Sequence, residues 1–254
     1  NNKPSGTWEY WGWDGVKMMD EVYDNGELVK KINYKIYFPD SQKPQNIPVE
    51  AKWDQKLNVW SYHDKKKEKL YAWYINGEKK YLSSASSSGV INGSIIMWYQ
   101  NGSIEREEYY INRIAQGLHK KYNENGGLIE DNYYKDDELI WTNDYTKKPP
   151  AGLPEGVAWN KQWKGWKYTK KNKVYILYDS GNTNCEVEIR GLDFHGKFIK
   201  WQDGGSIILE GNYVNSKKEG TWIMYNKSGT KVHCEYYYKN NKNIGQKVLA
   251  DFNS

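Results

Sequence analysis

The chain of 254 residues has few of the residue types that usually identify a small exported domain or a membrane protein. Two cysteines are too few for a disulfide-rich scaffold. No apolar run approaches the roughly 18 residues that a membrane helix requires. The 37 basic and 32 acidic residues nearly cancel, and no dense block of lysine and arginine marks a nucleic-acid surface. We therefore expect no nucleic-acid partner.

Tryptophan, tyrosine and glycine are abundant instead, with 13, 23 and 23 copies, in a chain whose mean hydropathy is −0.97. Tyr and Trp have an apolar body and a polar edge, which suits sheets that are half in contact with water. Disordered chains are depleted in aromatic residues, so this chain is expected to fold. The low hydropathy predicts that its core is thin.

One spacing recurs along the chain: a glycine, an aromatic residue five positions later, a glycine nine positions after the first, and a tyrosine eight positions beyond that. Two pairs of neighbouring copies are spaced by 24 residues, and a degenerate copy has Trp163, Tyr168 and Asn172 at the matching spacing. The full copies are Gly6/Trp11/Gly15/Tyr23, Gly93/Trp98/Gly102/Tyr110, Gly117/Tyr122/Gly126/Tyr134, Gly196/Trp201/Gly205/Tyr213 and Gly220/Tyr225/Gly229/Tyr237.

Each copy of this frame predicts a β-hairpin. Residues 221–225 are strand formers, 226–229 form a turn with a glycine suited to positive φ, and 230–238 form the return strand. A single hairpin is barely stable in water, so the copies must stack against one another. The predicted fold class is all-β: an elongated antiparallel meander of repeated β-hairpins in a single-layer twisted sheet, with few or no helices.

Proline-rich segments indicate interruptions. We predict an N-terminal hairpin block over 1–147 with a proline-rich insertion at 38–48, a hinge at 148–156, and a C-terminal hairpin block over 157–254. One continuous sheet is the alternative. The charge changes sign near the hinge, with 21 basic and 23 acidic residues before position 157 and 16 and 9 after it.

The repeat also bears on the two cysteines. Cys185 and Cys234 are two repeats apart, which places them about 19 Å apart at roughly 4.8 Å per strand. A disulfide needs Cα atoms within about 7 Å. We therefore expect free thiols.

The sequence offers no convergent set of catalytic groups. The four histidines, His63, His119, His195 and His233, fall in four segments without metal-ligand spacing. Carboxylates cluster at 105–108 and 136–138, where we expect solvated surface. We predict that the chain is not an enzyme and needs no cofactor or metal.

The stretch Gly220-Thr221-Trp222-Ile223-Met224-Tyr225, with its turn glycine and its return strand ending in tyrosines, resembles the bacterial variant class of MORN repeats. The resemblance is clear over 93–137 and 196–240 and fair over 6–26. It implies an open, elongated antiparallel sheet used as a scaffold or dimerisation surface. It also implies an exported or surface protein of a bacterium.

Three functions are compatible with this pattern. The favoured one is a non-catalytic scaffold for protein partners. Its expected contact residues are tyrosines that lie next to each other on return strands. The others are a carbohydrate or cell-wall module and contact with anionic lipid through the basic C-terminal half. We expect export to the periplasm or cell surface, with a lipid anchor ahead of Asn1, and a cytoplasmic location stays open. The candidate interaction residues are Tyr109, Tyr110, Tyr133, Tyr134, Tyr213, Tyr236 and Tyr237.

Overall fold

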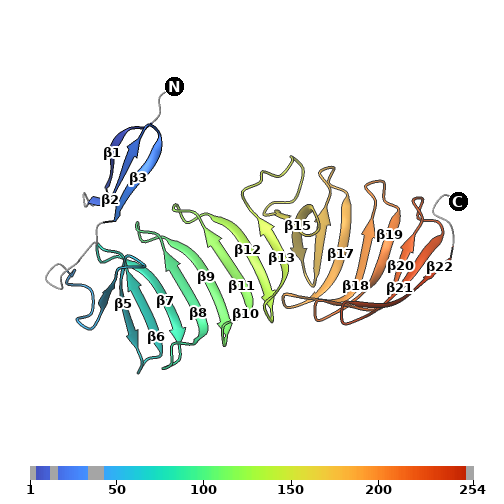
Figure 1. Cartoon of the computed structure of the whole chain (residues 1–254). Helices are drawn as coiled ribbons and strands as arrows, with labels where there is room; N and C mark the ends of the chain where they lie inside the picture. Colours follow the sequence, from blue (N-terminus) through green and yellow to red (C-terminus); the bar gives the residue numbers. More distant parts are fainter. Residues whose placement is uncertain (1–3, 12–16, 34–42, 250–254) are drawn as a thin grey trace. The chain divides into compact units, whose positions relative to one another are not determined.

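A computed structural model describes residues 4–11, 17–33 and 43–249. Within these ranges the chain is built of β-strands and turns and contains no helix, so none could cross a lipid bilayer. The strands form an antiparallel meander of hairpins in a large, twisted, open sheet (Figure 1). The predicted fold class is confirmed.

The chain divides into two compact units, residues 1–89 with 100–102, and residues 90–99 with 103–254. The predicted boundaries at 148–156 stay a prediction. In the second unit this segment is part of the connection between two strands, β13 and β14, that pair directly with each other.

The first unit holds a three-stranded sheet and a four-stranded meander. Its core is formed by Ile47, Ala51, Trp60 and Trp73. Ile47 belongs to the predicted proline-rich insertion, of which 43–48 form turns and 38–42 lie outside the described residues. The strands are β1 (Gly6–Trp11), β2 (Lys17–Asp24), β3 (Glu27–Asn33), β4 (Lys52–Asp54), β5 (Val59–Asp64), β6 (Lys69–Trp73) and β7 (Lys79–Ala85).

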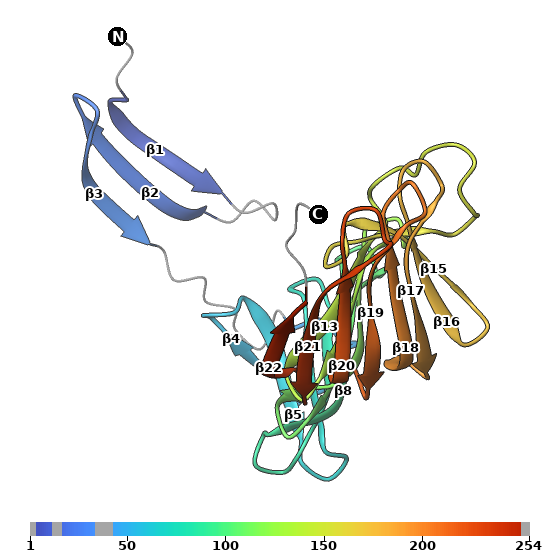
Figure 2. The same cartoon turned by 90° about the vertical axis from the view of Figure 1, so that its right-hand side faces the viewer.

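The second unit is also a meander, and Figures 1 and 2 show its strands following one another in chain order. Among the described strands of this unit, only the short β10 departs from a simple ladder, since both β10 and β11 pair with β9. The strands are β8 (Ile91–Trp98), β9 (Ile104–Ile111), β10 (Ile114–Ala115), β11 (Gly117–Tyr122), β12 (Leu128–Lys135), β13 (Glu138–Asp144), β14 (Ala158–Asn160), β15 (Gly165–Lys170), β16 (Lys173–Leu177), β17 (Thr183–Arg190), β18 (Asp193–Trp201), β19 (Ile207–Val214), β20 (Lys217–Tyr225), β21 (Val232–Lys239) and β22 (Lys242–Val248).

The residues of the repeated frame occupy equivalent positions in their hairpins. Its first glycine pairs with the frame tyrosine in four copies, as in Gly117 with Tyr134, and has a positive φ of 71–118° in all five. Its second residue always follows a β-bulge, a local extra residue that bends the strand. The bulges lie between Tyr10/Trp11, Met97/Trp98, Lys121/Tyr122, Lys200/Trp201 and Met224/Tyr225.

Two copies differ from the prediction. In the fifth copy Gly220 pairs with Tyr238 and not with Tyr237, because the turn at 226–231 is one residue longer than that at 123–127. The degenerate copy at Trp163 is not a frame hairpin, since Asn172 follows β15 in a tight turn. The additional hairpin is β16–β17, whose turn residue Gly181 lies 24 positions before Gly205.

The main core lies in the second unit. It combines Tyr133 and Trp141 of β12–β13 with Val187, Phe198 and Trp222 of later strands. These strands are far apart in the ladder, so the sheet must curl to bring them together. The two cysteines are buried free thiols on β17 and β21, with three strands between them as the repeat predicted.

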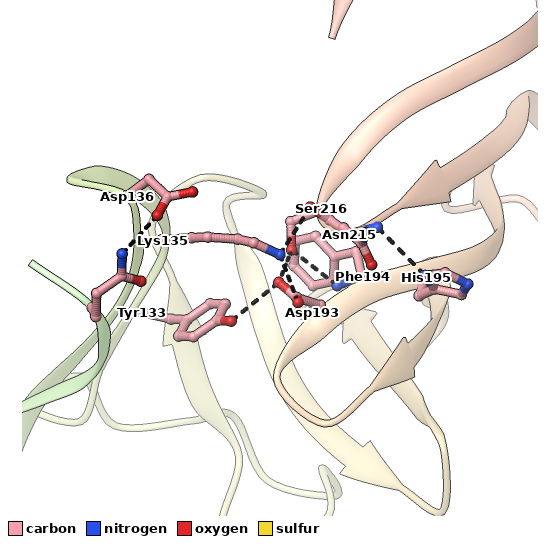
Figure 3. Close-up of polar contacts among 9 residues, drawn as sticks. Tyr133, Lys135, Asp136, Asp193, Phe194, His195, Asn215 and Ser216 are labelled. Atoms are coloured by element: carbon pink, nitrogen blue, oxygen red, sulfur yellow. Dashed lines mark hydrogen bonds and ion pairs between the residues drawn. The ribbon is translucent and has the colours of Figure 1, made fainter. Parts of the chain in front are cut away.

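A half-buried carboxylate joins the two groups of hairpins across this curl. Asp193, at the start of β18, accepts hydrogen bonds from Lys135 Nζ (2.7 Å), Ser216 Oγ (2.8 Å) and Tyr133 Oη (3.1 Å) (Figure 3). Burial raises the pKa of Asp193, but these hydrogen bonds outweigh it and bring the pKa below its usual value. The contact therefore holds β12 against β18, although β13–β17 lie between them in the ladder.

We expect Asp193→Ala to lower the free energy of unfolding by about 2 kcal/mol, because three donors lose a charged acceptor. In the wild type the folded state holds fewer protons on this group than the unfolded state. Its contribution should therefore be complete above about pH 4 and fade as the pH falls below that value. Urea unfolding at neutral and acidic pH measures both effects. An equal loss in the exposed Glu155→Ala variant would contradict this role.

A second prediction concerns Gly211, which lies under the indole of Trp222. A Cβ at position 211 would overlap that ring. We expect Gly211→Ala to destabilise the protein by about 1–3 kcal/mol through overpacking. Gly204→Ala is the matched control, because a Cβ there meets open space. Equal melting temperatures for the two variants would contradict this packing.

Candidate interaction surface

Two of the seven candidate tyrosines belong to the core. Tyr133 is 9% exposed and packs on Trp141, with ring centroids 5.6 Å apart. Tyr213 is also 9% exposed and lies between Phe198 and Trp222. Neither side chain is available to a partner in the folded protein.

Tyr110 and Tyr134 enclose a buried histidine. The ring centroid of His119 lies 5.2 Å from that of Tyr110 and 4.7 Å from that of Tyr134. Burial and a hydrogen bond to Glu108 raise the pKa of Tyr110 to about 12. The two tyrosines border a polar hollow of about 400 Å³, which Arg106 also lines.

The remaining candidates are distributed differently. Tyr109 is 45% exposed. Tyr236 and Tyr237 are both half-buried, and the Tyr237 hydroxyl donates a hydrogen bond to Glu235 (2.8 Å). Neighbouring tyrosines point to opposite faces, as strand geometry requires, but the set does not form one outward stripe.

Another candidate surface follows the two-residue turns of the second unit. Both central residues have positive φ at 112–113, 136–137, 215–216 and 240–241, the conformation of type I′ turns. We call these four turns the turn row.

Hydrogen bonds fix most of the turn row from one turn to the next. In three of the turns the second residue binds a strand residue of an adjacent hairpin through both its backbone N–H and its side chain. Asp137 binds Ala115, Ser216 binds Phe194 and Asn241 binds Lys218 in this way. Between 136–137 and 215–216, Lys135 Nζ donates to the carbonyl oxygen of Asn215 (3.4 Å) beside Asp193 (Figure 3).

Exposed aliphatic side chains lie close in sequence to the turns of the turn row. They flank the polar turn residues, and each is between 38% and 62% exposed. Such side chains tolerate water singly, but a contiguous set with polar borders is typical of a binding surface. They are Ile111, Ile114, Leu139, Val214 and Ile244, with Leu192 beside Asp193.

A half-buried lysine on β15 lies away from this surface. The Lys167 ammonium lies 3.4 Å from the centroid of the Trp141 ring. Burial lowers the pKa of Lys167 to about 8, against the opposing attraction of Asp131. Burial also raises the pKa of Asp131, which accepts a hydrogen bond from Tyr145 (3.1 Å).

The titratable residues singled out from the sequence stay dispersed. His63 and His195 contact backbone groups of Ser86 and Asn215, far apart in the chain. Glu108 and Asp137, one from each predicted carboxylate cluster, line the polar hollow together. In the part of the chain that the structure describes, no group of three or more His, Cys, Asp or Glu residues could hold a metal ion.

No protein-family model matches the chain, and no curated protein matches its sequence. The resemblance to variant MORN repeats therefore stays a prediction that rests on the frame and its hairpins.

Sequence reasoning placed the candidate surface on the tyrosines and missed the turn row. The sequence signal for it is a two-residue segment that begins with Asn or Asp and has aliphatic neighbours, as in Ile111-Asn112-Arg113-Ile114. Such dipeptides favour type I′ turns, which expose both flanking residues near the strand ends.

We expect NMR titration of Lys167, assigned by loss of its signal in Lys167→Met, to give a pKa near 8. The unfolded chain binds more protons than the folded one between about pH 8 and the ordinary lysine value. This group should therefore make stability rise with pH across that window, and Lys167→Met should remove the rise. A titration at the ordinary lysine value would show that water reaches the ammonium.

Proposed function

We propose that this protein is a non-catalytic scaffold that binds a protein partner through the turn row of its second unit. The observation that carries the proposal is the set of exposed aliphatic side chains beside hydrogen-bonded turns. Because hydrogen bonds already order these turns, little conformational entropy would be lost on binding.

The chemistry of the turn row supports a protein as the partner. Ile111, Leu139 and Val214 provide apolar contact, while Asn112, Arg113 and similar turn residues provide a polar border. Protein interfaces combine such an apolar centre with a polar rim, and arginine is enriched in them. The polar hollow beside Tyr110 and Tyr134 offers a second, more hydrophilic contact. The proposed setting is an envelope or surface assembly, as the resemblance to variant MORN repeats implies.

The test compares two positions of a photo-crosslinking residue in cells of the source organism. Leu139 lies beside the turn row and Asn125 is an exposed residue of the turn between β11 and β12. We expect a discrete protein adduct from position 139 and none from position 125. The triple variant Ile111→Glu, Leu139→Glu and Val214→Glu should keep its melting temperature, because surface changes rarely alter stability by more than about 0.5 kcal/mol.

The captured partner, once purified, should bind the triple variant at least about tenfold more weakly than the wild type, a loss of about 1.4 kcal/mol. Equal affinity for both would reject the turn row as the binding surface. Adducts of equal yield from positions 125 and 139 would do the same.

A further inference from the structure

A second candidate site lies at the multi-residue turns of β16–β19, at the strand ends opposite to turn 215–216. A hollow of about 560 Å³ opens there between the turns at 178–182 and 202–206. Its side chains come from Asn182, Thr183, Glu186, Trp201 and Asp203, and its floor includes Gly204 and Gly205. It therefore combines one aromatic ring with two carboxylates, an amide and a hydroxyl.

Two equivalent positions in the array show what usually fills this place. The hydroxyl of Tyr122, the second frame residue of its copy, donates to Glu107 of the preceding hairpin (2.6 Å). Tyr225 donates to Glu210 in the same way. In both hairpins the carboxylate accepts a hydrogen bond from a tyrosine hydroxyl.

Trp201 and Glu186 stand 24 residues before Tyr225 and Glu210, so they are the third example of this pair. The lysine beside the carboxylate recurs as well, since Lys173 binds Glu186 (3.0 Å) as Lys197 binds Glu210 (3.5 Å). Only the aromatic residue differs. Tryptophan has no hydroxyl to donate to Glu186, and the hollow is found at this position.

The walls of the hollow are held in place by other contacts. The carbonyl oxygen of Trp201 accepts a hydrogen bond from the Tyr178 hydroxyl (2.9 Å). Asp203 accepts hydrogen bonds at Oδ1 from Ser180 and Asn182, and Glu186 accepts one at Oε1 from Lys173. Among the described residues, the second oxygen of each carboxylate has no hydrogen-bond partner, so both are available to a ligand.

We propose that this hollow is a saccharide-binding subsite. An indole ring offers a flat apolar face to the C–H groups of a sugar ring, and binding sites add a few placed polar groups that fix orientation. The carboxylate oxygens accept hydrogen bonds, while the indole N–H and the Thr183 hydroxyl donate them. A polyhydroxylated ring satisfies donors and acceptors together. A quaternary ammonium ion would use only the ring and the carboxylates, and Lys173 already neutralises Glu186.

This proposal is independent of the scaffold function, because the hollow and turn 215–216 lie at opposite strand ends. A failure of saccharide binding leaves the protein-binding proposal untouched, and the reverse also holds. Partner capture at position 139 and saccharide binding at Trp201 are separate measurements.

The test uses saturation-transfer NMR with soluble cello-, chito- and malto-oligosaccharides, and with choline chloride as the cationic alternative. We expect at least one oligosaccharide series to receive saturation from the wild type. Trp201→Tyr should reduce the affinity at least tenfold, because the new hydroxyl can bind Glu186 as Tyr225 binds Glu210. This variant reproduces a pair that the array already contains, so its melting temperature should be retained.

Trp98→Tyr is the matched control, since Trp98 is the second frame residue of another copy and lies outside the hollow. It should bind the saccharide as the wild type does. The proposal is overturned if no oligosaccharide receives saturation, if choline alone binds, or if Trp201→Tyr binds as well as the wild type.

Discussion

Every frame hairpin of this protein depends on its neighbours, because one hairpin cannot remove its own aromatic ring from water. Trp222 and Trp8 occupy the same frame position, two residues after the first glycine. Trp222 packs among Phe198, Tyr213 and Tyr238 and is 1% exposed. Trp8, in the three-stranded sheet, contacts Tyr23 and is 52% exposed. The hydrophobic effect therefore acts between copies, and stability belongs to the array.

The same dependence makes the number of inserted strands important. Three strands, β13–β15, separate the Gly117 hairpin from the hairpin β16–β17. Because this number is odd, the first strand of every later frame hairpin runs antiparallel to the first strand of the Gly117 hairpin. Reversing a hairpin within a sheet exchanges its two faces. Tyr134 and Tyr213 are equivalent in the frame, yet strand pairing places Tyr133 on the face of Tyr213. The core confirms this, since Tyr133 and Tyr213 belong to it together.

This reversal explains how far the sequence could predict the structure. Hairpins, the positive φ of the turn glycine and the separation of the cysteines all follow from local spacing, and they were predicted correctly. Which tyrosine of a pair is buried depends on strand count across 138–172, where the frame is lost. The pairing of Gly220 with Tyr238 depends on one extra turn residue. To predict the hollow at Trp201, one must know that Glu186 lines it too, which only the hairpin β16–β17 reveals.

The two kinds of turn give the array unequal freedom to change length. The turn at 226–231 accommodates its extra residue because the Asn226 side chain accepts hydrogen bonds from the N–H groups of Thr230 and Lys231. Three of the four turns in the turn row have no such reserve, since their second residue is bound through both its backbone and its side chain to an adjacent hairpin. Insertions should therefore accumulate in the multi-residue turns during divergence. New loops could enlarge the region around Trp201 while the turn row keeps its spacing.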